Sequence, residues 1–431
     1  MSVVLYIGSG AVVAIATLIL ALRRHSAGKY LSVYSQPGPF YPIKFAAFYV
    51  LLRLRKLRGD SGGDGGDAGG GHGGGSGYGR KSHASEADME RVQPLSAHPQ
   101  AIDAAYFNGY SRDGWYFGAG IQRRHHLKAE CIMVIRPPET ILDGDVLEWP
   151  WGPATDVDAV DDSSWNAGGL TYQTVTPMKE WRVTFNGELR QRRGRQVRQV
   201  SFDLTWRAET PCFDFDTDMD AGPTCEAIAR EPWSGDFFQR LREAHQTHYE
   251  QFGRLTGEIK VQDVGQWQLN LDSMRDRSYG LYRKWNDFHR YILQYFVLED
   301  STCIAFHLVC LPVLMTHLIT GFVITPDKKK LAATASSRSL WQIGETEPPP
   351  KTYQVDLTVQ GNQRYELEVT SVDAPSYYCG WNWEARLYCV LAKIRCKLPD
   401  GRIVNGRGMC EFEYRHSGGR TDGRVPVPSN C

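Results

Sequence analysis

The sequence lacks several patterns that would assign a function directly. Its ten cysteines include no C-x-x-C pair and no cysteine–histidine spacing of the zinc type. There is no G-x-x-x-x-G-K-[ST] phosphate loop and no Asn-x-Ser/Thr acceptor for glycosylation. Lysine plus arginine and aspartate plus glutamate both total 49, so nucleic-acid binding receives no general support. We expect no cofactor and no metal. The cysteines should be free, reduced thiols, and Cys303, Cys310 and Cys389 should be buried.

One long run without charge stands at the beginning of the chain. Val3–Leu22 holds twenty uncharged residues, enough for roughly 30 Å of hydrocarbon as a helix. Arg23, Arg24 and Lys29 follow it, whereas a secretory signal carries its charge ahead of the apolar run. We therefore expect residues 1–24 to be a transmembrane anchor. The positive-inside rule places the bulk of the chain in the cytosol, with membrane lipids as a partner and the organelle undetermined.

The next two segments indicate how a folded part would be attached. Residues 36–58 carry Phe45, Phe48, Leu51 and Leu52 at helical spacing and end in a cluster of arginine and lysine. This pattern fits an amphipathic helix in the membrane interface, or an ordinary buried helix. Residues 59–100 begin with a glycine-rich stretch and stay polar, so we expect a flexible linker.

From residue 101 the pattern changes to short strands separated by Gly, Pro, Asn and Asp. Regular spacing of many such strands favours sandwiches or barrels over parallel α/β units. The strand patterns divide into residues 101–222 and 254–416, and Asn186-Gly187 reads as a hairpin turn. Between them we expect a connecting helix over residues 223–253, capped by Ser234 and ended by Gly253. Residues 417–431 should be a disordered tail.

The stretch Leu269–Trp285 is dense in charge for a strand pattern. It contains a carboxylate, Asp276, among arginines and aromatics. Charges at such density favour a solvated edge or turn. The other interpretation is a polar cluster at the mouth or floor of a barrel, where Arg275 and Asp276 would satisfy each other.

Six motifs in order carry a resemblance to a known family. They are Asp214–Asp218 (DFDTD), Arg230–Trp233 (REPW), His245–Gln251 (HQTHYEQ), Arg275–Gly280 (RDRSYG), Gly380–Arg386 (GWNWEAR) and Glu411–His416 (EFEYRH). The set resembles the amino-terminal region of animal phosphoenolpyruvate synthase-like proteins. That region is similar to the hydroxyneurosporene synthase (carotenoid hydratase) and AttH-like group. The resemblance covers roughly residues 100–416 and implies a mainly β fold of two lipocalin-like antiparallel β-barrels joined by a helix.

Two departures from the family limit what the resemblance implies. In the animal proteins this region accompanies phosphotransfer domains, which have no counterpart before Cys431. Phosphotransfer is therefore not expected of this chain, and whether a phosphotransfer-domain protein is its partner stays open. The family's Arg-Asp-His-Ser also reads Arg275-Asp276-Arg277-Ser278 here. An arginine stays protonated, so Arg277 cannot replace a histidine that shuttles a proton.

Three functions remain open on this basis. The preferred one is a membrane-tethered module that binds an apolar small molecule, a lipid or isoprenoid, inside its barrels. The second is a hydratase- or lyase-like enzyme acting on an apolar polyene, which needs an acid and a group that stabilises a cation. The third is a non-catalytic scaffold with filled barrels. The candidate catalytic residues that match family motifs are Asp276, Glu384, Glu411 and Tyr414. The candidate ligand-binding residues are Arg275, Tyr279, Trp285, Tyr295, Phe306, Trp381, Trp383 and Arg386.

Overall fold

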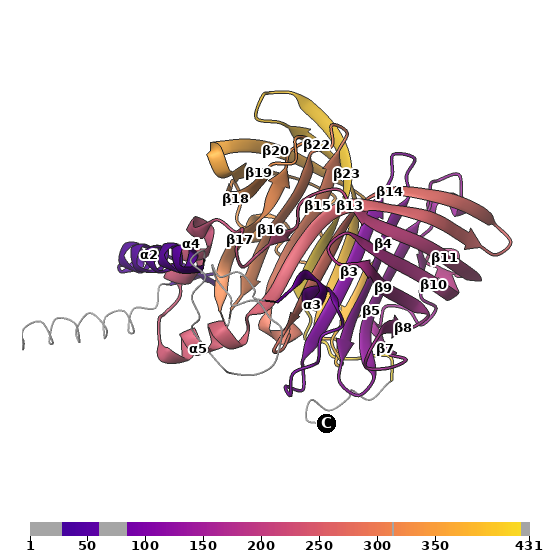
Figure 1. The fold of residues 1–431 in the computed structure, drawn as a ribbon, viewed down its shortest axis with the longest axis horizontal. Helices are drawn as coiled ribbons and strands as arrows, with labels where there is room; N and C mark the ends of the chain where they lie inside the picture. Colours follow the sequence, from indigo (N-terminus) through magenta and orange to yellow (C-terminus); the bar gives the residue numbers. More distant parts are fainter. Residues whose placement is uncertain (1–27, 60–83, 313, 424–431) are drawn as a thin grey trace, which may run out of the picture.

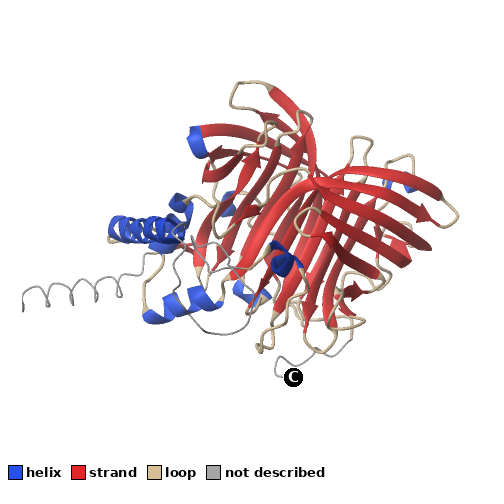
Figure 2. Ribbon diagram, viewed as in Figure 1, coloured by secondary structure: helices blue, strands red, loops and turns tan. Residues whose placement is uncertain are grey.

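Two closed antiparallel β-barrels of eight strands stand side by side in the protein (Figures 1 and 2). The computed structural model describes residues 28–59, 84–312 and 314–423. The predicted anchor at residues 1–24 lies outside them. In the part that is described, no helix is long and apolar enough to cross a membrane.

The first barrel closes in the order β11-β13-β14-β3-β4-β5-β6-β10, with β10 returning to β11. Its longest hairpin, β13–β14, pairs Gln246 with Gly280 at one end and Val261 with Gly265 at the other. The inward-facing side chains fill the barrel with a packed core that includes Phe107, Trp181 and Trp206. The strands are β3 (Ile102–Tyr110), β4 (Tyr116–Arg124), β5 (Lys128–Arg136), β6 (Leu147–Glu148), β7 (Asp156–Asp158), β8 (Trp165–Ala167), β9 (Leu170–Thr176), β10 (Glu180–Gln191), β11 (Val197–Ala208), β12 (Phe213–Asp214), β13 (Gln246–Val261) and β14 (Gly265–Gly280).

The second barrel closes in the order β20-β19-β18-β17-β16-β15-β23-β22, with β22 returning to β20. It too has a filled interior, built around residues such as Phe296, Phe306 and Phe412. Core side chains thus occupy the barrel interiors where the sequence suggested apolar ligands. The strands are β15 (Arg290–Leu298), β16 (Cys303–Leu311), β17 (Met315–Ile324), β18 (Lys330–Ser336), β19 (Thr352–Val359), β20 (Gln363–Asp373), β21 (Ser376–Cys379), β22 (Ala385–Lys397) and β23 (Ile403–Arg415).

The outer walls of the two barrels pack against each other. One shared cluster joins Tyr110 and Val134 of the first barrel to Tyr291 and Leu391 of the second. Another places Met274 among side chains of the second barrel. Residues that alternate with each core thus form a second apolar layer between the barrels, and this layer fixes how the two walls face each other.

Three helices lie beside the second barrel (Figure 1). They are α2 (Tyr41–Gly59), α4 (Ala221–Arg230) and α5 (Gly235–Glu243); a short α3 (Glu86–Glu90) and the hairpin β1 (Lys29–Tyr30)–β2 (Tyr34–Ser35) complete the elements. Phe48 and Leu52 of α2 are buried in a cluster with α4 and α5. The opposite side of α2 is also apolar and is exposed, at Ile43, Val50, Leu54 and Leu57. The apolar face predicted from Phe48 and Leu52 is therefore packed on protein, and a different stripe faces outward.

The single helix predicted over residues 223–253 is instead two helices, α4 and α5, and the prediction is wrong beyond Ala244. Ser234 does cap α5, by accepting a hydrogen bond from the backbone N–H of Phe237. The helix ends at Glu243 because the chain then pairs with β14 over the full length of β13. The predicted boundary at residue 254 is wrong for the same reason, since β13 and β14 close the first barrel. Asn186-Gly187 is also no turn: both residues lie inside β10 and pair with Ser201 and Val200.

Parts of the two segments expected to be flexible, residues 84–100 and 417–423, are packed on the protein, and the rest of each segment except Gly59 lies outside the described residues. In the predicted linker, Glu90 is fully buried and forms an ion pair with Arg275. In the predicted tail, the buried Arg420 side chain pairs with Asp156, 2.9 Å away. Their polar composition hid these contacts because each depends on a partner far along the chain. Cys303, Cys310 and Cys389 are buried and free, as predicted.

Candidate functional site

A cavity of about 340 Å³ lies between the outer walls of the two barrels. Its volume falls within the range typical of small-molecule sites. The apolar part of the lining includes Ile132, Trp285, Phe288, Tyr291, Leu293, Val309, Leu311, Leu314, Met315 and Leu318. The polar part includes Gln122, Glu130, His245, Gln246, His248, Asp276, Ser278, Arg283, His307 and Glu411.

The strand register explains why titratable groups meet at this place. On the first barrel, Asp276 pairs across β14 with Tyr106 on one side and Glu250 on the other. On the second barrel, Leu293 stands between Glu411 and His307. These two cross-strand rows belong to facing walls, so their side chains point into the same space.

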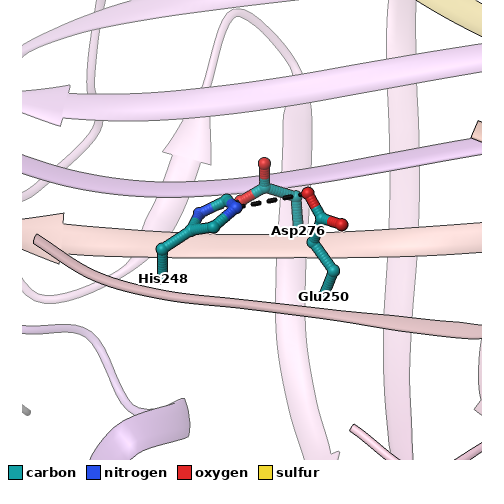
Figure 3. Close-up of side chains that lie close together, drawn as sticks. All are labelled: His248, Glu250 and Asp276. Carbon is teal, nitrogen blue, oxygen red and sulfur yellow. Dashed lines mark hydrogen bonds and ion pairs between the residues drawn. The ribbon is translucent and has the colours of Figure 1, made fainter. Parts of the chain in front are cut away.

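His248, Glu250 and Asp276 form the centre of the cluster (Figure 3). Nε2 of His248 lies 3.2 Å from Oε1 of Glu250, and its Nδ1 lies 3.5 Å from Oδ1 of Asp276. Nε2 of His307, from the other barrel, lies 3.0 Å from the same Glu250 oxygen. The Tyr295 hydroxyl donates to Glu250 at 3.1 Å. Glu250 thus connects both walls of the cavity.

The pKa values of this cluster are shifted by burial and by mutual charge. Burial opposes the charged form of His248, but Asp276 and Glu250 outweigh it and raise the pKa of the imidazole. Burial also opposes ionisation of Glu250, yet His307 and His248 lower the pKa of this carboxyl to about 2. For Asp276, burial and the nearby Glu250 raise the pKa in spite of His248. An imidazolium next to carboxylates is the state that these contacts favour.

Glu411 is in a different electrostatic state. Burial, followed by the charge of Asp276, raises the pKa of this carboxyl to about 8. A hydrogen bond with Tyr106 and the charge of Arg283 lower this pKa by less. At neutral pH its side chain is therefore mostly a protonated acid facing the cavity. A neutral acid and a charged cluster in one cavity is the arrangement that acid–base chemistry uses.

The donor atoms of His248, Glu250 and Asp276 lie within 4.8 Å of one another, close enough to hold a metal ion. Nitrogen and carboxylate oxygen donors suit zinc and similar ions. Both ring nitrogens of His248 already face carboxylate oxygens, however, so the ion pairs account for the cluster as it stands.

Of the residues predicted from the sequence, Asp276, Glu411 and Trp285 line the cavity. Tyr295 contacts the cluster through its hydroxyl. Glu384 and Trp381 line a neighbouring recess of about 60 Å³, which shares Arg283 and Glu130 with the main cavity.

The remaining predicted residues lie elsewhere. Arg275 and Tyr279 point into the first barrel because side chains on β14 alternate, so Arg275 cannot satisfy Asp276. In the second barrel Phe306 is a core residue, and the Tyr414 hydroxyl donates to the carbonyl of Gly344. Trp383 stacks on Tyr378, and Arg386 pairs with Glu347.

The residues that sequence reasoning missed are His248, Glu250, His307 and Arg283. His248 and Glu250 were assigned to a helix, where a spacing of two separates side chains. In a strand the same spacing puts both on one face, which is the signal that a strand assignment would have used. His248 also provides an imidazole beside Asp276, whereas Arg277, where the resemblance implied a histidine, pairs with Asp103 inside the barrel.

The fold and the cavity define a protein of two antiparallel β-barrels with a candidate small-molecule site between their outer walls. The chain belongs to a family of unknown function, DUF8627, whose model matches residues 79–414. No curated protein matches the sequence.

Several solved structures are similar to this one. Kievitone hydratase from Nectria haematococca aligns with a TM-score of 0.47 at 11% identity, over 76% of this chain and 94% of its own. A putative AttH from Nitrosomonas europaea aligns with a TM-score of 0.46 at 13% identity, over 74% and 94%. CghA with Sch210972 aligns with a TM-score of 0.49 at 13% identity, over 77% and 97%. The resemblance to phosphoenolpyruvate synthase-like proteins finds no support among these matches and stays a prediction.

Proposed function

We propose that the protein binds a mainly apolar small molecule between its barrels and transfers a proton to it, as a hydratase- or lyase-like enzyme. One observation carries this proposal. The protonated carboxyl of Glu411 and the His248–Asp276 ion pair, which the buried Glu250 supports from behind, face the same largely apolar cavity. A buried acid with a pKa near the working pH is well suited to general acid catalysis.

The residues fit an addition of water across a carbon–carbon double bond. Glu411 gives its proton to one carbon, and the neighbouring carbon takes up positive charge. The carboxylates of Asp276 and Glu250 stabilise that charge across the cavity. Water then forms the carbon–oxygen bond and gives a proton to Asp276, whose raised pKa makes it a stronger base. That proton leaves to solvent as Glu411 is protonated again, and the reverse sequence is an elimination.

The experiment begins with the molecule that the protein carries. Apolar compounds that copurify with the full-length protein are extracted and identified by mass spectrometry. The recovered compound is then offered to wild-type protein and to the Glu411→Gln and Asp276→Asn variants. We expect similar affinity in all three and at least a hundredfold slower conversion by each variant, because the amides cannot transfer the proton.

Glu413→Gln is the matched control. Burial also raises the pKa of Glu413 to about 8, but this residue does not line the cavity. Its variant should convert the compound at the wild-type rate. Equal conversion by all variants would contradict catalysis by Glu411. If no sample converts the compound, the protein binds it without catalysis. Absence of any bound apolar compound would favour the scaffold.

We also propose that the protein works at a membrane surface. The uncharged run Val3–Leu22 precedes α2, and the exposed stripe of α2 offers Ile43, Val50, Leu54 and Leu57 to an apolar phase. Arg53, exposed on the same helix, suits anionic headgroups. This placement brings a protein for apolar ligands close to where such ligands dissolve.

A further inference from the structure

Arg283 lines the cavity, and hydrogen bonds to neutral oxygens hold its guanidinium in place. It follows β14 and lines the polar part of the cavity. Its guanidinium donates to Oε1 of Gln246 at 2.7 Å, to Oγ of Ser278 at 2.9 Å and to Oε1 of Gln122 at 3.2 Å. These partners come from β13, β14 and β4 and hold the planar group at a fixed place.

The fully buried arginines of the described structure pair with carboxylates, whereas Arg283 is partly buried at the cavity wall. Arg275 pairs with Glu90, Arg277 with Asp103, Arg290 with Glu345 and Arg124 with Glu130. Arg283 has no such ion pair among the described residues, and burial lowers its pKa. Charged groups away from water are normally paired, because desolvation of a lone charge is costly.

The nearest carboxylates are already engaged. Glu130 accepts hydrogen bonds from Gln122, Arg124, Trp285 and the backbone of Gly380. Asp276 faces His248. The protein thus holds the Arg283 guanidinium in place without pairing it to a carboxylate of the described residues, so the group is able to bind an anion.

The wall opposite this cation has a different character. Leu311, Leu314, Met315 and Leu318, from the second barrel, present an apolar surface to the same cavity. A molecule that satisfies both sides has an apolar body and one anionic group. A single planar guanidinium matches a carboxylate, which it can bind through two parallel hydrogen bonds.

We infer that the ligand is an apolar carboxylic acid whose carboxylate pairs with Arg283, an inference that rests on the proposed function. The carboxylate at Arg283 would hold the apolar body between Glu411 and the charged cluster. Arg283 would then select substrates by their acid group and fix which carbon faces the proton donor.

The test compares octanoic acid with octanol, which share an apolar body and differ in charge. Binding to the full-length protein in phosphatidylcholine nanodiscs is measured by calorimetry at neutral pH, with the heats of empty discs subtracted. We expect the acid to bind at least about tenfold more tightly than the alcohol. Arg283→Met should abolish this preference while leaving the alcohol unaffected, and Arg283→Lys should retain part of it.

Arg182→Met serves as the control, because Arg182 is exposed on the first barrel and pairs with Asp203 away from the cavity. It should keep the full preference for the acid. If octanol binds as well as octanoic acid, the carboxylate inference is overturned while the apolar site stands. If neither compound binds, both the inference and the proposed apolar site fail. A preference that survives in Arg283→Met would overturn the role of Arg283.

Discussion

Neighbouring side chains on β14 point in opposite directions, one set into the first barrel and the other into the cavity. Arg275 and Arg277 enter the first barrel, where each lies over aromatic rings and pairs with a carboxylate. Asp276, between them, enters the cavity with His248. A one-residue change of register would exchange these environments, leaving arginines in the cavity and a carboxylate among tryptophans. The hairpin with β13 fixes this register over sixteen residues.

The protonation of Glu411 gives a first prediction at the scale of the residue. Its pKa is raised from 4.5 to about 8, so the acid form dominates below about pH 8 and disappears above it. Conversion of the ligand should therefore fall as pH rises through about 8. The infrared carbonyl band of the protonated acid, isolated as the difference between wild type and Glu411→Gln, should vanish over the same range. A midpoint near 4.5 would show that the carboxyl is ionised at neutral pH.

At the scale of elements, the segment before β3 acts as a plug for the first barrel. Glu90, at the end of α3, accepts hydrogen bonds from Tyr249 at 2.7 Å and from Trp181 at 2.6 Å, besides its ion pair with Arg275. Asp103, where β3 begins, binds both Arg123 and Arg277. Arg275 and Arg277 of β14 thus pair with carboxylates on α3 and β3. The segment that carries α3 covers one end of the barrel.

Removal of one partner should show what this plug contributes. Glu90→Gln leaves Arg275 buried with an uncompensated charge, so the free energy of unfolding should fall by about 3–5 kcal/mol. Urea unfolding measures this change. Glu86→Gln, on the exposed side of the same helix, should change it by less than about 0.5 kcal/mol. A small effect of Glu90→Gln would mean that the segment does not stabilise the barrel.

The sequence predicted the β class and a series of short strands through residues 254–416, because alternation and turn residues act locally. It failed where a partner far along the chain decides the structure. Phe237 and Leu241 follow a helical spacing and do pack as a helix, but the spacing continues by chance to Phe252, which pairs in β13. Asp276 and Glu411 were found through motifs. His307 carries no local signal, since only the facing of two walls brings it to Glu250. Arg283 belongs to the charged stretch Leu269–Trp285, but its partners on β4 and β13 lie far along the chain.

At the scale of the whole molecule, the proposed membrane placement predicts that the exposed stripe of α2 faces the bilayer. Photocrosslinking in the full-length protein tests this orientation, with benzoylphenylalanine at position 54 in lipid vesicles. We expect lipid adducts at this position, because Leu54 belongs to the exposed apolar stripe.

Two positions calibrate the crosslinking result. Phe48 on the packed face of α2 should crosslink to protein, and Val175, exposed on the first barrel, should give no lipid adduct. Lipid adducts at 175 with none at 54 would place the opposite side of the molecule on the bilayer.

The location of the cavity between two outer walls also bears on how such proteins diverge. Along the strands that line the cavity, such as β14 and β15, alternate positions belong to different compartments, one inside a barrel and one at the cavity. Mutations at cavity positions can accumulate without disturbing either core, since no core side chain has to move. Ligand preference and fold stability can therefore evolve on separate sets of residues, which lets one scaffold acquire new chemistry while its two barrels stay intact.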